Sequence, residues 1–357
     1  RSTLFPYTTL FRSRPSPYKS RQGKISRPIG KEDRHKIAMK LLFITATRGG
    51  DAVLSTGLLN HLIESNPGIR VTVACGPAAV SLFEAVPNVD RVIGIEKKTL
   101  SLHWATLWTK CFGQFWDVLV DLRNSSMYYA LLGGKRYHMT GSKEPVHRLV
   151  QLSKILGLEN NPPLPKLWTG PQHEDAAVQH IPDGNPVLAL GPTANWRAKT
   201  WRAEFFAELM EQLTGPTGIL AGARVAVFGH ESEREMAEPL IKAIPEERCL
   251  DLIGRIDLLT VAACLKRSDL YIGNDSGLMH LAAAAGVPTL GLFGPSKEEH
   301  YGPWGTHCGV VRTKQSYDTV FPPGFDHLTS DTLMDGLSVN AAVEAATTLW
   351  QRTKEAA

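Results

Sequence analysis

Residues 272–296 read IGNDSGLMHLAAAAGVPTLGLFGPS, a pattern that predicts the end of one strand, a helix and a second strand. The first strand is the short apolar run at 269–273, and the helix covers 278–285. A Gly-Val-Pro sequence ends that helix, and residues 289–293 form the second buried strand. This order is typical of a parallel α/β domain.

The turn between the first strand and the helix is the part that indicates a ligand. Its sequence, Asn-Asp-Ser-Gly at 274–277, is rich in residues that favour turns and helix N-termini. At the carboxyl edge of a parallel sheet such a helix offers free backbone N–H groups and a positive dipole end to phosphate. An ordinary capped helix explains the pattern about equally well. His280, one turn into the helix where an apolar residue is the default, favours the ligand site.

Composition bounds the class of protein. The 357 residues are enough for two domains, and no apolar run approaches the roughly 20 residues of a membrane span. Ten Lys and Arg against two acidic residues lie in positions 1–36, so the remainder carries a net charge of −4, which argues against nucleic acid as a partner. Five cysteines without a C-x-x-C spacing are typical of reduced thiols in a cytoplasmic protein.

Residues 1–36 show no helical or alternating period and are rich in Arg, Ser and Pro. The opening repeats Thr-Leu-Phe and Arg-Ser, which favours a disordered or non-native tail outside the fold. A basic arm that contacts a membrane surface is the alternative. We expect removal of this tail to leave activity intact.

Strands and helices alternate twice along the rest of the chain, which predicts an α/β fold of two Rossmann-like, doubly wound domains facing a cleft. The domains are expected at 37–180 and 181–337, joined by a Pro-rich linker around 158–185, with a last helix in 338–357 packing back across the junction. The expected strands are 40–46, 69–74, 91–95 and 116–121, then 187–190, 223–228, 269–273 and 289–293, and the expected helices are 52–65, 77–85 and 100–112, then 201–213, 232–243, 258–266, 278–285 and 338–353.

Several common catalytic motifs are missing. The sequence contains no G-x-G-x-x-G, P-loop or G-x-S-x-G motif, which argues against nicotinamide or flavin enzymes, P-loop NTPases and α/β-hydrolases. It also has no D-x-D and no histidines at metal-ligand spacing. We therefore expect no cofactor and no metal.

Three features together resemble the ADP-heptose:lipopolysaccharide heptosyltransferase family, glycosyltransferase family 9. They are R-x-G-D at 48–51, Lys199 before Trp201, and D-S-G-x-x-H-x-A-A-A-x-G-x-P-T-x-x-L-F-G-P-S from Asp275. The resemblance covers about residue 38 to the C-terminus. It implies a GT-B fold, with the acceptor on the N-terminal domain and the nucleotide sugar on the C-terminal one. It also implies an inverting, metal-independent transfer of heptose from ADP-heptose to a lipopolysaccharide core precursor. Trp201-Arg202 departs from the Trp-Pro that the family often has.

Asp51 is the candidate catalytic base, because an inverting transfer needs a group that takes the proton of the acceptor hydroxyl. Its alternative role is as the N-cap of a helix that begins at Ala52.

The expected donor site lies in the C-terminal domain. The leaving diphosphate needs hydrogen-bond donors and positive charge, and Asp275 is implied to meet the donor sugar unless it is only a helix cap. An acid after the strand 223–228 should bind the ribose, with Glu233 preferred to Glu231, although a surface glutamate at a helix start is the alternative. The full donor set is Thr193, Lys199, Glu231, Glu233, Asp275, Ser276, Gly277 and His280.

The expected acceptor site lies in the N-terminal domain, with Arg48 and, in the basic stretch 128–148, Arg136 and Lys143. Arg48 would hold a phosphate or an acidic acceptor, and a solvated loop cation is the alternative. We expect a lipid-linked glycan acceptor, an ADP-sugar donor and peripheral contact with the cytoplasmic face of the inner membrane. A GT-B transferase or epimerase for another nucleotide sugar, or a non-catalytic nucleotide-sugar binding module, remain the alternatives.

Overall fold

A computed structural model describes residues 38–356 except 98, 142–143 and 327–329. Residues 38–357 form one compact unit. The predicted tail at 1–36 lies outside the described residues, as does Lys143.

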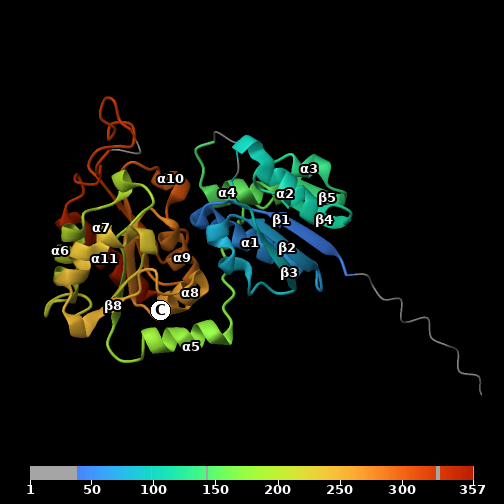
Figure 1. Cartoon of the computed structure of the whole chain (residues 1–357). Coiled ribbons are helices and arrows are strands. Elements are labelled where there is room, and N and C mark those ends of the chain that lie inside the picture. The colour runs from blue at the N-terminus through green and yellow to red at the C-terminus, as the bar shows by residue number, and fades with distance from the viewer. Residues whose placement is uncertain (1–37, 98, 142–143, 327–329, 357) are drawn as a thin grey trace, which may run out of the picture. The chain divides into compact units, whose positions relative to one another are not determined.

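The N-terminal sheet consists of five parallel strands in the order β3-β2-β1-β4-β5 (Figure 1). Each residue from Leu41 to Ile44 in the central strand is fully buried, because helices cover both faces of the sheet. The elements are β1 (Lys40–Ile44), α1 (Gly49–Ser65), β2 (Arg70–Cys75), β3 (Val89–Gly94), α2 (Leu102–Cys111), β4 (Trp116–Asp121), α3 (Met127–Ala130), β5 (Gly133–His138) and α4 (Arg148–Ser153).

The C-terminal sheet consists of six parallel strands in the order β11-β10-β9-β6-β7-β8. Its elements, with the preceding helix, are α5 (Pro171–His180), β6 (Val187–Gly191), α6 (Ala203–Thr214), β7 (Arg224–Val227), α7 (Arg234–Ala243), β8 (Cys249–Asp251), α8 (Leu258–Lys266), β9 (Leu270–Asn274), α9 (Gly277–Ala285), β10 (Thr289–Phe293), α10 (Glu298–Tyr301), β11 (Cys308–Arg312) and α11 (Val339–Glu355).

The two sheets share one topology. In each, the first strand lies inside the sheet, the next two extend to one side and the fourth starts the other side. The direction of winding therefore reverses between β1 and β4 and again between β6 and β9, and ligands of doubly wound sheets bind outside the carboxyl ends of the strands at such a point. The predicted fold class, two Rossmann-like doubly wound domains, is confirmed.

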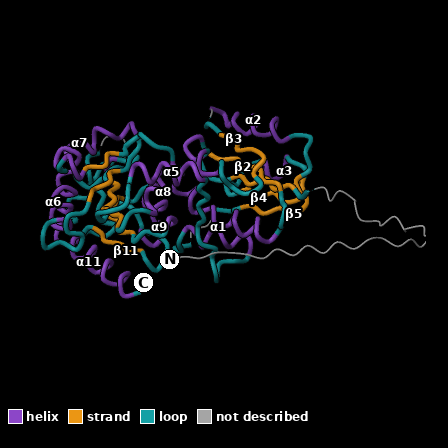
Figure 2. Tube along the Cα trace, turned by 90° about the horizontal axis from the view of Figure 1, so that it is seen from below, coloured by secondary structure: helices purple, strands orange, loops and turns teal. Residues whose placement is uncertain are grey.

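The faces of the N-terminal sheet have different neighbours. Helix α1 lies on one face and α2 on the other, as Figure 2 shows, and the apolar side chains of α2 and α3 form a separate core with one side of the strands. On the opposite face α1 packs against α9 of the C-terminal half. The core that includes α1 therefore continues into the second sheet.

Some predicted elements differ from the observed ones. Residues 77–85 form two 3₁₀ turns, Pro77–Ala79 and Ser81–Phe83, rather than one helix. Strands β5, β8 and β11 were not predicted. Helix α5 lies in the segment predicted to be a linker, and it packs against α8.

The prediction that the last helix packs across the junction is wrong. Helix α11 packs on α6, β10 and β11, and its buried side chains belong to the core of the C-terminal sheet. The buried side of α11 carries Ala342, Ala346 and Leu349, and these side chains help to fill the core of its own sheet.

Candidate functional site

Asp51 lies in the first turn of α1, directly after the carboxyl end of β1. The helix begins at Gly49, and Arg48 in extended conformation occupies the N-cap position without a side-chain cap. The alternative role of Asp51 as the cap of a helix starting at Ala52 is therefore wrong. Its carboxylate oxygen Oδ1 is 3.5 Å from Nε of Arg148, at the start of α4. That oxygen is buried and has no hydrogen-bond partner within the described part of the chain.

Helix α9 begins at the carboxyl end of β9, at the winding reversal of the C-terminal sheet. Ser276 is its N-cap residue, and the Ser276 side chain makes no capping bond. Asn274 instead fixes the turn, because its amide accepts from the backbone N–H of Trp201 and donates to the carbonyl of Pro192. The first N–H groups of α9 are left without a capping side chain, as a site for an anion requires.

The N-termini of α1 and α9 meet through two glycines. A Cβ atom on Gly277 would lie 3.2 Å from the backbone nitrogen of Gly50, and a Cβ on Gly50 would lie 2.9 Å from Cδ2 of His280. Both distances are shorter than ordinary carbon contacts, so a larger residue at either position would force its neighbour to shift. Two positive helix ends are thereby brought to one place.

Lys199 forms an ion pair with Asp275 at this junction. Its Nζ lies 2.5 Å from Oδ2 of Asp275, whose side chain is only 6% exposed. The Lys199 ammonium is also 5.7 Å from the ring of Trp196. Because Ser276 is the cap of α9, the alternative that Asp275 serves only as a helix cap is wrong.

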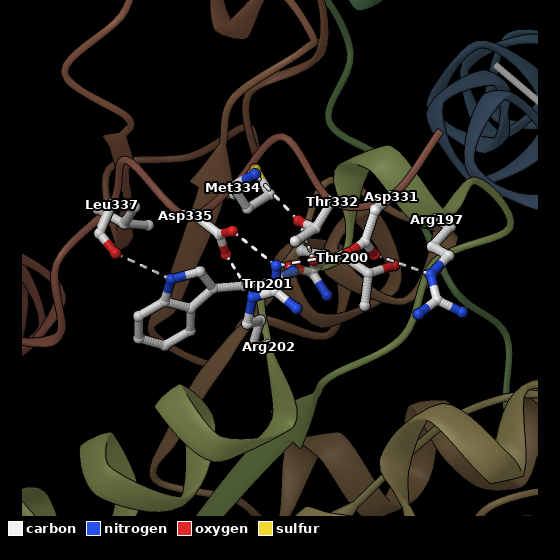
Figure 3. Close-up of polar contacts among 10 residues, drawn as sticks. Arg197, Thr200, Trp201, Arg202, Asp331, Thr332, Met334, Asp335 and Leu337 are labelled. Carbon is white, nitrogen blue, oxygen red and sulfur yellow. Dashed lines mark hydrogen bonds and ion pairs between the residues drawn. The ribbon is translucent and has the colours of Figure 1, made fainter. Parts of the chain in front are cut away.

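The loop that carries Lys199 is held by the segment 331–337, as Figure 3 shows. The backbone N–H of Leu333 donates to the carbonyl of Ala198, and the Thr332 hydroxyl donates to the carbonyl of Thr200. The guanidinium of Arg202 makes two hydrogen bonds to Asp335. The residue that departs from the family's Trp-Pro pattern therefore anchors this loop.

His280 is buried beside these charges. Burial lowers the pKa of its imidazole, while the carboxylates of Asp275 and Asp51 raise it and Lys199 lowers it. Its Nδ1 has no hydrogen-bond partner among the residues that the structure describes. A neutral imidazole with one free ring nitrogen can bond a ligand without adding charge.

The two glutamates after β7 point to different places. Glu233 accepts a 2.7 Å hydrogen bond from the hydroxyl of Thr193, which follows the carboxyl end of β6. Glu231 is 64% exposed and lies 3.5 Å from the guanidinium of Arg234. The structure therefore brings Glu233, and not Glu231, to the winding reversal.

The three predicted acceptor residues differ in their availability to a ligand. Arg48 is exposed at the start of α1. The guanidinium of Arg136 donates to the carbonyls of Tyr128, Leu131 and Gly133, so it holds the α3 turn and is not free to bind an acceptor. Lys143 lies outside the described residues.

Arg123 and Tyr301 were missed by the sequence analysis, whereas Arg148 is the last residue of the basic stretch 128–148 that was predicted to meet the acceptor. The guanidinium of Arg123 lies 4.9 Å from the Trp104 ring just after β4, and its Nη1 has no partner among the described residues. Burial lowers the pKa of the Arg123 guanidinium, and the negative charge of Asp121 raises it by a smaller amount. Burial, and then the nearby carboxylate of Asp51, raise the pKa of Tyr301. No local motif marks these residues, since each depends on contacts between distant segments.

Two kinds of feature are absent from the described residues. They contain no group of three or more His, Cys, Asp or Glu side chains arranged to hold a metal ion. None of their helices combines the length and apolar character needed to cross a membrane.

Sequence comparisons show the family of the chain. Residues 118–320 match the model of glycosyltransferase family 9 (heptosyltransferase). The chain is 31% identical to lipooligosaccharide heptosyltransferase 2 of Haemophilus influenzae over 77% of this chain and 88% of that protein. It is 32% identical to lipopolysaccharide heptosyltransferase 1 of Pseudomonas aeruginosa over 75% and 82% of the two chains.

Solved structures show the same fold. A glycosyltransferase family 9 protein from Veillonella parvula superposes with a TM-score of 0.69 and 20% identity, over 88% of this chain and 97% of that one. The Escherichia coli ADP-heptose lipopolysaccharide heptosyltransferase II gives 0.67 and 21%, over 88% and 100%. The E. coli heptosyltransferase WaaC, solved with ADP, gives 0.65 and 15%, over 87% and 100%.

Proposed function

Because this chain belongs to glycosyltransferase family 9, the heptosyltransferases, we propose that it transfers heptose from ADP-heptose to a lipid-linked lipopolysaccharide core acceptor, with inversion at the transferred carbon. The observation that carries the proposal is the meeting of α1 and α9 at Gly50 and Gly277. This contact brings the Asp51 carboxylate, whose Oδ1 has no hydrogen-bond partner among the described residues, to the same place as an anion site at the start of α9. A base and a leaving-group site are the two parts that an inverting transfer needs.

The donor half of the reaction is assigned to the C-terminal domain. Backbone N–H groups at the start of α9 and the ammonium of Lys199 stabilise the charge that develops on the departing ADP. One N–H of the Lys199 ammonium donates to Asp275 in the free protein, and its other two N–H groups can donate to phosphate oxygens. Glu233 faces the site beside Thr193 and accepts from the ribose hydroxyls.

The acceptor half is assigned to the N-terminal domain. Asp51 removes the proton of the attacking hydroxyl, and the guanidinium of Arg148, whose Nε lies 3.5 Å from Oδ1 of Asp51, places a positive charge beside the carboxylate. Arg123 and Arg48, at the carboxyl edge of the same sheet, suit an acidic acceptor. Because a lipid-linked acceptor lies in a bilayer, the enzyme works at the cytoplasmic face of the inner membrane through peripheral contact.

The test is turnover with a defined donor and a panel of truncated core lipids, in which the release of ADP is measured. We expect release only when ADP-heptose and an acceptor are both present. In parallel, ADP should raise the melting temperature and UDP should not, because only a ligand that binds the folded state stabilises it. Stabilisation by UDP instead would favour a transferase or epimerase for another nucleotide sugar. ADP binding without turnover on any acceptor would favour a binding module.

The proposed reaction needs no metal, since backbone N–H groups and Lys199 take the role of a cation at the diphosphate. Turnover in excess EDTA should therefore equal turnover in added Mg²⁺. A loss of activity in EDTA that Mg²⁺ restores would contradict this part of the proposal.

A further inference from the structure

Exposed apolar side chains are concentrated on the outer face of the N-terminal domain. Among the described residues, ten large apolar side chains are exposed, and six of them lie between positions 100 and 132. We call these six the α2–α3 face: Leu100, Leu102, Phe112, Phe115, Tyr129 and Leu132. Scattered single apolar residues are normal on a protein surface, but such a concentration marks an interaction site.

Contacts between distant segments connect part of the α2–α3 face. The indole N–H of Trp108 in α2 donates to the carbonyl of Ala130 in α3, and the Phe112 ring lies 4.4 Å from the Trp108 ring. Phe115 and Leu132 precede two paired strands, β4 and β5, and the backbone N–H of Trp116 donates to the carbonyl of Leu132. Helices α2 and α3, which carry or flank these residues, lie on the side of the sheet opposite the face on which α1 packs against α9 (Figure 2).

Leu100 supports a functional role for this face. It is 92% exposed and has a φ of +52°, in the left-handed region that costs a non-glycine residue about 1 kcal/mol. The next residue, Ser101, has a φ of +59°. The chain thus holds an exposed leucine on an unfavourable backbone at the start of α2, where an asparagine or glycine would fit better.

The charge around the face is positive. Residues 97–138 contain six Lys and Arg against two Asp, whereas residues 37–357 as a whole carry a net charge of −4. Asp117 accepts from the backbone N–H of Lys40, and Asp121, the last residue of β4, is fully buried. Of the basic residues, Arg136 is held by three backbone carbonyls and Arg123 lies over the Trp104 ring. Lys97 and Lys110 are exposed beside the apolar residues.

We propose that the α2–α3 face binds the surface of an anionic lipid bilayer. Apolar side chains among lysines are the combination that inserts into the interfacial region and attracts acidic headgroups. A protein partner would not need the basic excess, and a second copy of this chain would set like charges against each other. The inference rests on the proposed function only in that a lipid-linked acceptor gives the contact its use.

The experiment measures binding to vesicles of phosphatidylcholine with and without phosphatidylglycerol, by co-sedimentation of the full chain. We expect binding that requires phosphatidylglycerol and weakens as salt rises. The charge variant K97E/K110E should bind at least about 25-fold more weakly, at about fivefold per lysine near an acidic surface. The apolar variant L100N/F112S should bind at least about tenfold more weakly in every salt condition.

Matched controls lie away from the face. K166E/K242E makes the same charge change, and L164S/V178S removes two other exposed apolar side chains; both should bind as the wild type does. Turnover on a soluble, delipidated acceptor and the melting temperature should be unchanged in all four variants. Vesicle binding does not depend on the donor, so loss of heptose transfer with intact binding would refute the proposed function and leave this inference standing.

Three results would overturn the inference. The first is that the wild type does not bind acidic vesicles. The second is that the control variants lose binding as much as the variants of the α2–α3 face. The third is that light scattering finds a wild-type dimer that L100N/F112S converts to a monomer, which would make the face a contact between two copies of the chain.

Discussion

Gly50→Ala tests the contact between the two helix ends. The added Cβ would lie 2.9 Å from Cδ2 of His280, so the imidazole or the α1 backbone must move by about 0.5 Å to restore ordinary contact. Overpacking of this kind costs about 1–3 kcal/mol, against a gain of up to about 1 kcal/mol from replacing a helical glycine. The net effect on the free energy of unfolding is therefore small, whereas Asp51, the next residue, shifts relative to the donor site.

The expected result is a loss of turnover without unfolding. Misplacement by 1 Å costs about 100-fold in rate, so a shift of half that size should lower kcat by about tenfold. Gly49→Ala is the matched control, because a Cβ there meets no described atom within 4 Å. The assay is ADP release at saturating donor, with the melting temperature measured for both variants. Equal kcat values for the two variants would refute the view that the close approach of α1 and α9 sets the catalytic geometry.

Three further predictions concern charged groups. Asp51→Asn should keep ADP-induced thermal stabilisation and lower kcat by about 100- to 10,000-fold, the range for loss of a general base; near-normal turnover would exclude Asp51 as the base. Lys199→Ala leaves the buried carboxylate of Asp275 unpaired, so it should lower the free energy of unfolding by about 3–5 kcal/mol and weaken ADP binding. The double variant K199A/D275N should regain the stability, measured by chemical denaturation, but not the affinity for ADP. Burial lowers the pKa of His147 to about 4, so the neutral imidazole contributes stability that is present above about pH 6.5 and lost as the pH falls towards 4. Over this window the free energy of unfolding of the wild type should drop by up to about 3 kcal/mol more than that of His147→Asn. An equal dependence of the free energy of unfolding on pH in the two proteins would contradict this prediction.

The predicted elements that match the structure share one feature, which is that their signal is local. Strand β4, helix α8 and strand β10 have the predicted bounds. Every residue of β10 and all but Asp117 of β4 are buried, so both sequences are rich in apolar residues. Helix α8 is preceded by Asp257, whose carboxylate accepts from two N–H groups of the first turn.

The missed strands are all at the edges of the sheets. Strand β5 ends the N-terminal sheet, and β8 and β11 end the C-terminal one. An edge strand has a neighbour on only one side and faces solvent over much of its length, so it needs no apolar run. The β5 sequence GGKRYH and the three residues of β8 could not be distinguished from loops without knowledge of the strand beside them.

The features of the site also fall into those with a local sequence signal and those without one. The sequence locates the helix starts near Asp51 and Ser276, because turn and cap residues mark them. It does not reveal the Lys199–Asp275 pair, whose members are 76 residues apart, or the approach of Gly50 to Gly277. The charge of Arg136 indicates an acceptor residue, whereas three backbone carbonyls nearby accept its hydrogen bonds. Roles of that kind depend on the tertiary structure.

The charges at the junction indicate how the free protein would receive its donor. Two helix N-termini supply about half a unit of positive charge each, and Lys199 and Arg148 are balanced by Asp275 and Asp51. About one unit of positive charge is left, which a diphosphate more than neutralises. When the phosphate oxygens attract Lys199, the carboxylate of Asp275 loses part of its ion pair and becomes an acceptor for the hydroxyl groups of the sugar. This transfer of Lys199 from Asp275 to the phosphate couples binding of the diphosphate to binding of the sugar. Asp275→Asn should therefore weaken binding of the nucleotide sugar more than binding of ADP. Equal losses for the two ligands, measured by calorimetry, would show that Asp275 acts only on Lys199.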